Sequence, residues 1–291
     1  MKYLPLLLLG AAAFATQAPA RPANRPAAPT APHNQQLGSQ SSQKFTFVAY
    51  GDTRSNPDVH RQVIGAIVKQ RPEFVLQSGD LVSDGGNPNQ WKEFDDITAP
   101  LRTAHIAYYP ARGNHDLGPY YPDHVREPIL SGNKFYYSFE RHKNMFIALD
   151  EFQDYDPSSQ QYQWLESQLK RGQQKDINTW ILFHESPFSV GPHGPTPEAL
   201  AYLHPLFIKY KPRAVVCGHD HLYYRTKRDS VTYLVTGGGG APLYDPTHTD
   251  LAIPGDVYVK TYHIIRLDVN GKHVDGTTLT PEGQIIDRFT L

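Results

Sequence analysis

The sequence has little of several things that would narrow its function. It has one cysteine in 291 residues, so no disulfide can form within the chain. That residue, Cys217, ends an apolar run, and we predict a small buried side chain and not a nucleophile. The formal net charge is only -1, which argues against a broad charged surface for nucleic acid or anionic lipid. Histidine is abundant, with 14 residues. We expect most of them to be ordinary surface and core residues and a few to bind metal.

The first 20 residues have the features of a secretory signal peptide. Lys2 precedes an apolar stretch, residues 4–15, and small residues follow it as far as Ala20. The stretch is shorter than the about 20 residues of a membrane-spanning helix, and no cysteine follows it for lipid attachment. We expect cleavage after Ala20, with Ala15 as the alternative. The predicted product is exported, periplasmic or secreted, and has no stable membrane anchor.

The rest of the chain divides at about residue 43. Residues 21–43 are rich in Pro, Ala, Gln, Ser and Asn and have no apolar periodicity, which predicts a disordered linker. Residues 44–291 have a length that suits a single domain with a full core.

Within this domain, runs of aromatic and branched residues alternate with helical patterns. Strands are expected in residues 44–50, 74–78, 106–109, 145–149, 179–183 and 214–217. Helices are expected in residues 58–69, 90–97, 160–169 and 197–210. After residue 230 only strands are expected, in residues 231–235, 257–268 and 285–291. The pattern predicts an α/β fold with a mixed sheet and a β-rich carboxyl-terminal third.

Metal-binding side chains stand at the ends of five of these strands, where ligand sites of α/β sheets collect. They are Asp52, Asp80, Asn114, His184, His219 and His221. Carboxylate, amide and imidazole donors together suit Zn, Mn or Fe better than Ca or Mg. One carboxylate can bridge two cations, and a two-metal site holds both the attacking and the leaving oxygen of a displacement. Two divalent ions, two carboxylates and a hydroxide sum to about +1, so such a site attracts phosphate.

Five motifs that contain these residues resemble those of the calcineurin-like metallophosphoesterases, in the same order. They are GDTR at 51–54, GDLV at 79–82, GNHD at 113–116, HESP at 184–187 and GHDH at 218–221. The segment VTYLVTGGGGAPLY at 231–244 is similar to the ending of the purple acid phosphatase-like branch. The resemblance spans residues 45–245. It implies a two-sheet mixed β-sandwich flanked by helices, in four layers (α/β/β/α), and hydrolysis of phosphate ester bonds.

The resemblance also implies a role for each metal-binding side chain. Asp80 would bridge two metals, and Asp52 and His221 would bind the first. The remaining ligands of the second would be Asn114, His184 and His219. The cofactors would be two divalent or trivalent transition-metal ions, Fe, Zn or Mn.

Two further histidines are candidates for contact with the substrate. The resemblance implies that His115 contacts the phosphate and protonates or stabilises the leaving oxygen, with Asp116 orienting its ring. The nucleophile would be a hydroxide that bridges the metals. His193 stands nine residues after His184, about where the purple branch places a substrate-facing histidine. The alternative for His193 is simple exposure in a Gly/Pro-rich loop.

Two residues depart from the family pattern. Arg54 stands where most of the wider family has a histidine, and Ser83 stands where the purple branch has a tyrosine. The first metal therefore lacks both of its usual extra ligands, although three ligands and water can hold a catalytic metal. Arg54 would oppose a neighbouring cation, and we interpret it as a clamp on the substrate phosphate. The alternative is a structural salt bridge to a carboxylate such as Asp84.

Together these predictions describe an exported phosphomonoesterase that acts on a small-molecule phosphate ester, with residues 44–291 as its catalytic domain. One alternative is a phosphodiesterase or nucleotide-directed hydrolase that uses the same site, because the loops that choose a substrate are not recognised by motif. The other is a non-catalytic metal-binding relative, which Arg54 and Ser83 motivate. The sequence indicates no oligomeric state.

Overall fold

The computed structural model describes residues 44–125 and 135–291, which belong to one compact unit, Ser41–Leu291. The predicted signal peptide and linker, residues 1–20 and 21–43, lie outside the described residues. Among the residues that are described, no helix is both long and apolar enough to cross a membrane.

The first of two sheets has six strands in the order β13-β12-β11-β1-β2-β3. Its strands are β1 (Lys44–Tyr50), β2 (Phe74–Gln77), β3 (Ala107–Pro110), β11 (Ile264–Asn270), β12 (His273–Leu279) and β13 (Ile285–Thr290). β1, β2 and β3 run parallel, whereas β11 to β13 add antiparallel pairs beside β1. The ends of β1, β2 and β3 therefore meet at one edge of the sheet.

The second sheet has seven strands in the order β10-β8-β9-β7-β6-β5-β4. Its strands are β4 (Tyr137–Arg141), β5 (Asn144–Ala148), β6 (Asn178–Glu185), β7 (Ala214–Gly218), β8 (Tyr223–Arg228), β9 (Val231–Thr236) and β10 (Val257–Val259). β5, β6, β7 and β9 are parallel neighbours, and β4, β8 and β10 pair antiparallel at the two sides. Both sheets are thus mixed.

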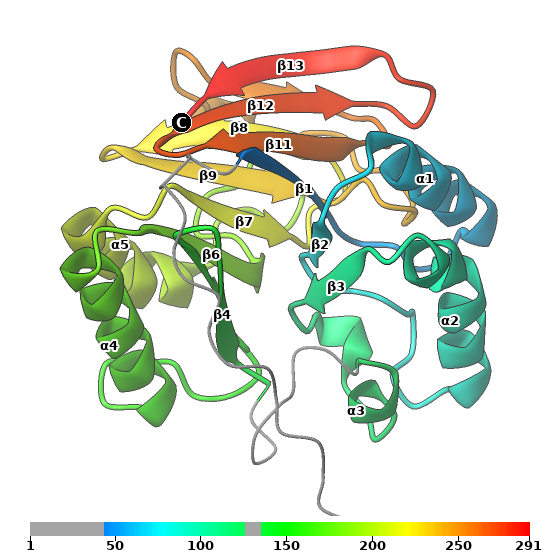
Figure 1. The fold of residues 1–291 in the computed structure, drawn as a ribbon, viewed down its shortest axis with the longest axis horizontal. Coiled ribbons are helices and arrows are strands. Elements are labelled where there is room, and N and C mark those ends of the chain that lie inside the picture. Colours follow the sequence, from blue (N-terminus) through cyan, green and yellow to red (C-terminus); the bar gives the residue numbers. More distant parts are fainter. Residues whose placement is uncertain (1–43, 126–134) are drawn as a thin grey trace, which may run out of the picture. The chain divides into compact units, whose positions relative to one another are not determined.

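Helices cover the outer face of each sheet (Figure 1). α1 (Pro57–Gln70) and α2 (Pro88–Thr103) pack on the first sheet, and α4 (Gln160–Gln174) and α5 (His204–Tyr210) pack on the second. A short α3 (Tyr121–His124) lies near α2. α1 begins at Pro57, because the side chain of Asn56 accepts from the N–H of Val59 and proline suits the first turn of a helix.

An aromatic core joins the two sheets. Phe47 and Phe74 of the first sheet stack with ring centroids 5.2 Å apart, and Phe146 and Trp180 of the second sheet meet Phe47 edge-on. These side chains are buried, so the apolar surface removed from water lies mainly between the sheets. The layers are therefore helix, sheet, sheet and helix, which confirms the predicted fold class. Cys217, on β7, is fully buried in the apolar cluster formed by the second sheet with α4 and α5, as predicted.

The prediction of the carboxyl-terminal third was wrong in one respect. Residues 257–268, expected as a single strand, form β10 in one sheet and β11 in the other. The segment between them crosses from one sheet to the other, and hydrophobicity along the chain does not record such a crossing. The short strands β4, β8 and β12 were not predicted. The predicted helix 197–210 is a π-helical stretch, Ala199–Leu203, that continues into α5.

Candidate metal centre

The six predicted metal ligands come together where the parallel strands of the two sheets end. Five of them follow β1, β2, β3 or β7, and His184 lies near the end of β6. Nε2 of His184 lies close to ligand atoms of Asn114, His219 and Asp80, and His221 lies close to Asp52. Atoms of Asp52, Asp80 and His184 all lie within 4.8 Å of one another, and all three residues are buried. Sequence positions up to 169 residues apart thus contribute to one site.

The backbone turns sharply to aim these side chains inward. Asp52, Asp80 and His219 have φ angles of 57°, 56° and 70°, in the left-handed region that side chains other than glycine rarely adopt. Such conformations cost on the order of 1 kcal/mol each and persist at sites that use them. The neighbouring Gly113 allows the close approach, because a Cβ there would lie 2.2 Å from Oδ1 of Asp80.

Three ligand atoms lie close to Nε2 of His184 in what we call the second position. Nε2 of His184 lies 3.1 Å from Oδ1 of Asn114, 3.2 Å from Nδ1 of His219 and 3.5 Å from Oδ1 of Asp80. Nδ1 of His184 donates to the carbonyl of Ser78 at 2.8 Å, so Nε2 of the neutral ring presents a lone pair. Ligands about 2.0–2.2 Å from a metal lie roughly 3–3.6 Å from one another. The three distances from Nε2 of His184 match that range, as expected for ligands of one cation.

Three ligand atoms form what we call the first position. Oδ1 of Asp52 lies 3.6 Å from Nε2 of His221, and the guanidinium of Arg54 contacts both Nε2 of His221 and Oδ2 of Asp80. Nδ1 of His221 donates to the carbonyl of Pro242 at 2.7 Å, which leaves Nε2 as the acceptor. Here the space already contains a positive charge, because Nε of Arg54 donates to Oδ2 of Asp80 at 3.1 Å. The first position therefore does not fit a metal ion as it stands.

Burial governs the ionisation of these side chains. It lowers the pKa of His219 to about 3 and that of His221 to about 4, so both rings are neutral at neutral pH and can donate lone pairs. Burial, with the nearby Asp80, raises the pKa of Asp52. Burial also opposes ionisation of Asp80, but His184 and the N–H of His115 outweigh it and lower its pKa. Asp80 is thus the more readily ionised carboxyl group.

His115 lies beside the second position, and its ring is held by a different residue from the one predicted. Its N–H donates to Oδ1 of Asp80 at 3.0 Å, which brings it next to the predicted bridging carboxylate. Its ring is held by the carbonyl of Ser83, 2.8 Å from Nδ1, and not by Asp116. Asp116 accepts from the backbone N–H groups of Gly113, Leu81 and Val82. It fixes the loops that carry the ligands, because a buried carboxylate satisfies several backbone donors at once.

His193 also borders the centre. Its ring lies 3.9 Å, between centroids, from the ring of His219. Nδ1 lies 3.0 Å from Oδ1 of Asp220, and this hydrogen bond raises the pKa of His193. Asp220 is buried and is held in turn by Ser189. His193 is exposed, but its ring is held by Asp220 and lies against a predicted ligand.

Arg54 forms a salt bridge, but its partner differs from the one suggested. Asp84 accepts from the N–H of Gly86, whereas the guanidinium of Arg54 pairs with Asp80. The prediction that Arg54 clamps the substrate phosphate is not tested by this geometry.

Three supporting residues were missed by sequence reasoning. Asp220 holds His193, Glu151 accepts from the N–H groups of His184 and Glu185, and Tyr244 stacks on His221 with centroids 4.0 Å apart. Asp220 stands inside GHDH, and Glu151 stands three residues past β5, so the same rule of polar strand ends could have found both. Tyr244 had no such signal.

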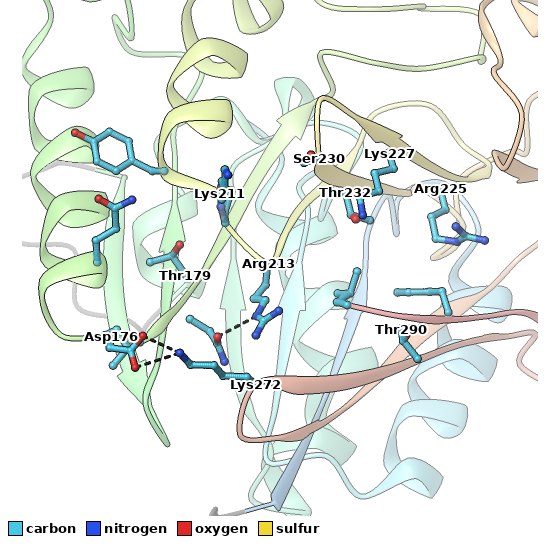
Figure 2. A pocket seen from close by; sticks show the side chains of 17 residues that line it. Asp176, Thr179, Lys211, Arg213, Arg225, Lys227, Ser230, Thr232, Lys272 and Thr290 are labelled. Carbon is cyan, nitrogen blue, oxygen red and sulfur yellow. Dashed lines mark hydrogen bonds and ion pairs between the residues drawn. The ribbon is translucent and has the colours of Figure 1, made fainter.

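Another hollow, of about 420 Å³, lies elsewhere and shares no residue with the centre (Figure 2). Several basic side chains line it, including Lys211, Arg213 and Lys227. Figure 2 shows Lys272 paired with Asp176, which offsets part of the charge. None of the predicted site residues lines this hollow.

The fold and the site define a layered α/β/β/α protein with a cluster of carboxylate, amide and imidazole ligands between two sheets. The family model of the calcineurin-like phosphoesterases matches residues 45–223, and the chain belongs to that family. This confirms the predicted family.

Individual relatives agree with this assignment. The chain is 28% identical to a purple acid phosphatase of Glycine max over 69% of its own length and 48% of the relative's. It is 24% identical to tartrate-resistant acid phosphatase type 5 of Mus musculus, over 72% and 76%. The structure of purple acid phosphatase PPD1 from Lupinus luteus seeds superposes with a TM-score of 0.74 at 19% identity, over 86% of this chain and 54% of the other. The chain thus spans about half the length of the plant proteins that it matches.

Proposed function

We propose that the protein is an exported, metal-dependent phosphomonoesterase, with residues 44–291 as its catalytic domain and a small-molecule phosphate ester as its substrate. The observation that carries the proposal is the second position. Nε2 of His184 lies 3.1 Å from Oδ1 of Asn114, 3.2 Å from Nδ1 of His219 and 3.5 Å from Oδ1 of Asp80, so four atoms that can accept lie close together. One shared proton cannot satisfy four acceptors, whereas a transition-metal cation can. A cation bound there would polarise a phosphoryl oxygen and lower the pKa of a bound water.

The chain's own residues supply the remaining parts. His115 is held through Nδ1 by the carbonyl of Ser83, so a ring protonated on both nitrogens would give a proton to a leaving oxygen from Nε2. His193 is held through Nδ1 by Asp220, so its Nε2 is the nitrogen that can meet a phosphate oxygen. Backbone and carboxylate contacts thus fix both rings before substrate arrives, which reduces the cost of ordering them on binding.

Export is proposed from the first 20 residues, in which a basic residue, an apolar stretch and small residues follow one another in the order of a signal peptide. The predicted cofactors were two transition-metal ions of unknown identity, Fe, Zn or Mn. The donor set supports an ion at the second position.

A substrate panel tests the proposal. Purified residues 44–291, with metal bound, would be assayed on an aryl phosphate, a bis-aryl phosphate and a nucleoside monophosphate. A phosphomonoesterase hydrolyses the first with the highest kcat/KM. Preference for the diester would replace the monoester assignment with a phosphodiesterase, and preference for the nucleoside monophosphate would assign a nucleotide-directed hydrolase. A folded, metal-loaded protein that hydrolyses none of them would overturn the enzyme assignment.

A further inference from the structure

The first position contains a side chain that makes the contacts a metal would make. Nε of Arg54 donates to Oδ2 of Asp80 at 3.1 Å, and Nη2 lies 3.5 Å from Nε2 of His221. Asp80 and His221 are two of the three predicted ligands of the first metal. A guanidinium is always protonated in proteins, so it presents only donors to these acceptors. Arg54 therefore contacts two of the three predicted ligands of the first position without an ion.

Arg54 and Ser83, the two departures from the family pattern, are connected by hydrogen bonds through Ser55. The hydroxyl of Ser83 lies 2.9 Å from that of Ser55, and Nη1 of Arg54 donates to the same Ser55 hydroxyl at 3.4 Å. Ser83 stands where a tyrosine of the purple branch would supply a metal ligand. Here it supports, through Ser55, the side chain that replaces the metal. Only 16% of the Arg54 side chain is exposed, so this arrangement is mostly enclosed.

The net charge of the centre stays positive when Arg54 stands in place of the first metal ion. One divalent ion at the second position contributes +2 and Arg54 contributes +1, against -2 from ionised Asp52 and Asp80. The sum is about +1, compared with about +2 for two divalent ions and two carboxylates when hydroxide is left out of both sums. A phosphate group would thus still meet a positive centre. A guanidinium fork also suits phosphate oxygens, so Arg54 can pair with Asp80 and face the substrate as well.

We propose that Arg54 takes the place of the first metal ion, and that the protein binds one ion per chain, at the second position. The substrate phosphate then lies between that ion and the guanidinium. This inference rests on the proposed function for the role of the phosphate, but its claim about the number of ions is independent of turnover.

The first test counts ions in the wild-type protein and in a matched pair of variants. Chelator-treated protein is dialysed against Zn²⁺ and analysed for metal by elemental analysis, with thermal unfolding to show that each variant is folded. We expect one ion in the wild type, none in His219→Ala and one in His221→Ala. These two histidines are two residues apart, and only His219 belongs to the second position. Two ions in the wild type, or loss of an ion in folded His221→Ala, would overturn the inference.

The second test removes the guanidinium. Arg54→His places an imidazole where most of the wider family has a ligand, and we expect two ions per chain in this variant. Arg54→Gln keeps a polar side chain of similar reach without charge, and serves if the histidine variant does not fold. A folded variant of either kind that still binds one ion would show that Arg54 does not exclude the first metal, and would overturn the inference.

The outcomes separate this inference from the proposed function. Two ions in the wild type with hydrolysis of a phosphate ester contradict only the inference. One ion without hydrolysis of any ester contradicts only the proposed function. A wild type that binds no ion contradicts both.

Discussion

Nε2 of His184 and Nδ1 of His219 lie 3.2 Å apart at the point where two sheets meet, although the two residues come from different strands. Two neutral imidazoles that face each other through acceptor nitrogens repel unless a proton or a cation lies between them. Asn114 and Asp80 add two more acceptors to the same space. These contacts therefore indicate a cation site.

Asp80 is expected to be indispensable for metal binding. Asp80→Asn should lower metal affinity and turnover by more than the roughly 10–100-fold that loss of an outer-shell partner causes, because it removes a direct ligand. Metal content and hydrolysis of an aryl phosphate measure the two effects. Asp84→Asn is the matched control, since Asp84 is exposed and four residues away. Full metal content in folded Asp80→Asn would show that the ligand set is wrong.

His115 is expected to act on the leaving group and not on the metal. His115→Gln should lower kcat by roughly 10²–10⁴-fold, the usual contribution of a general acid, while metal content stays at the wild-type value. His273→Gln, at an exposed position on β12, controls for loss of a histidine. An aryl phosphate with a very acidic leaving group should lessen the effect, because such a group departs without a proton. If kcat is unchanged on every ester, His115 has no such role.

His193 is expected to bind substrate. Removing a charged hydrogen bond of about 1.5–3 kcal/mol should raise KM in His193→Ala by roughly 10–100-fold, with a smaller change in kcat. Asp220→Asn should show part of the same effect, because Asp220 only positions the ring. A fall in kcat at constant KM would instead assign His193 to the chemical step.

Much of this site could be predicted because it depends on local patterns. Each ligand stands at the end of an apolar strand, and parallel strands bring their ends together without further information. The strand ends of β1, β2, β6 and β7 thus gave Asp52, Asp80, His184 and the two histidines of GHDH. The alternation of strands and helices likewise indicated the α/β class.

Other features could not be predicted because they depend on contacts between distant loops. The partner of Arg54 proved to be Asp80, 26 residues away, and not Asp84. The ring of His115 is held by a backbone carbonyl, which no residue pattern reveals. The division of residues 257–268 into β10 and β11 depends on where the chain crosses between sheets, and both parts have the composition of a strand.

His60 should make the fold sensitive to acid. Burial lowers its pKa to about 3, below the ordinary value of 6.5, so the unfolded chain binds one more proton between these pH values. The free energy of unfolding should therefore fall as the pH drops from about 6.5 toward 3, with a contribution of up to about 1.4 kcal/mol per pH unit from this group.

Urea denaturation of metal-free protein at several pH values measures this slope. His60→Gln should reduce the slope relative to the wild type, and His273→Gln is the control for loss of an exposed histidine. Parallel pH profiles for wild type and His60→Gln would contradict the assignment of a neutral, buried His60.

The central claim is that a bound transition metal is required for hydrolysis of phosphate esters. The most direct measurement is the rate of aryl phosphate hydrolysis by the purified protein, after removal of metal with a chelator and again after addition of Zn²⁺, Mn²⁺ or Fe²⁺. We predict that activity disappears with the metal and returns as the ion is added back. A rate that survives complete removal of metal, or no hydrolysis once the ion has bound, would contradict the account.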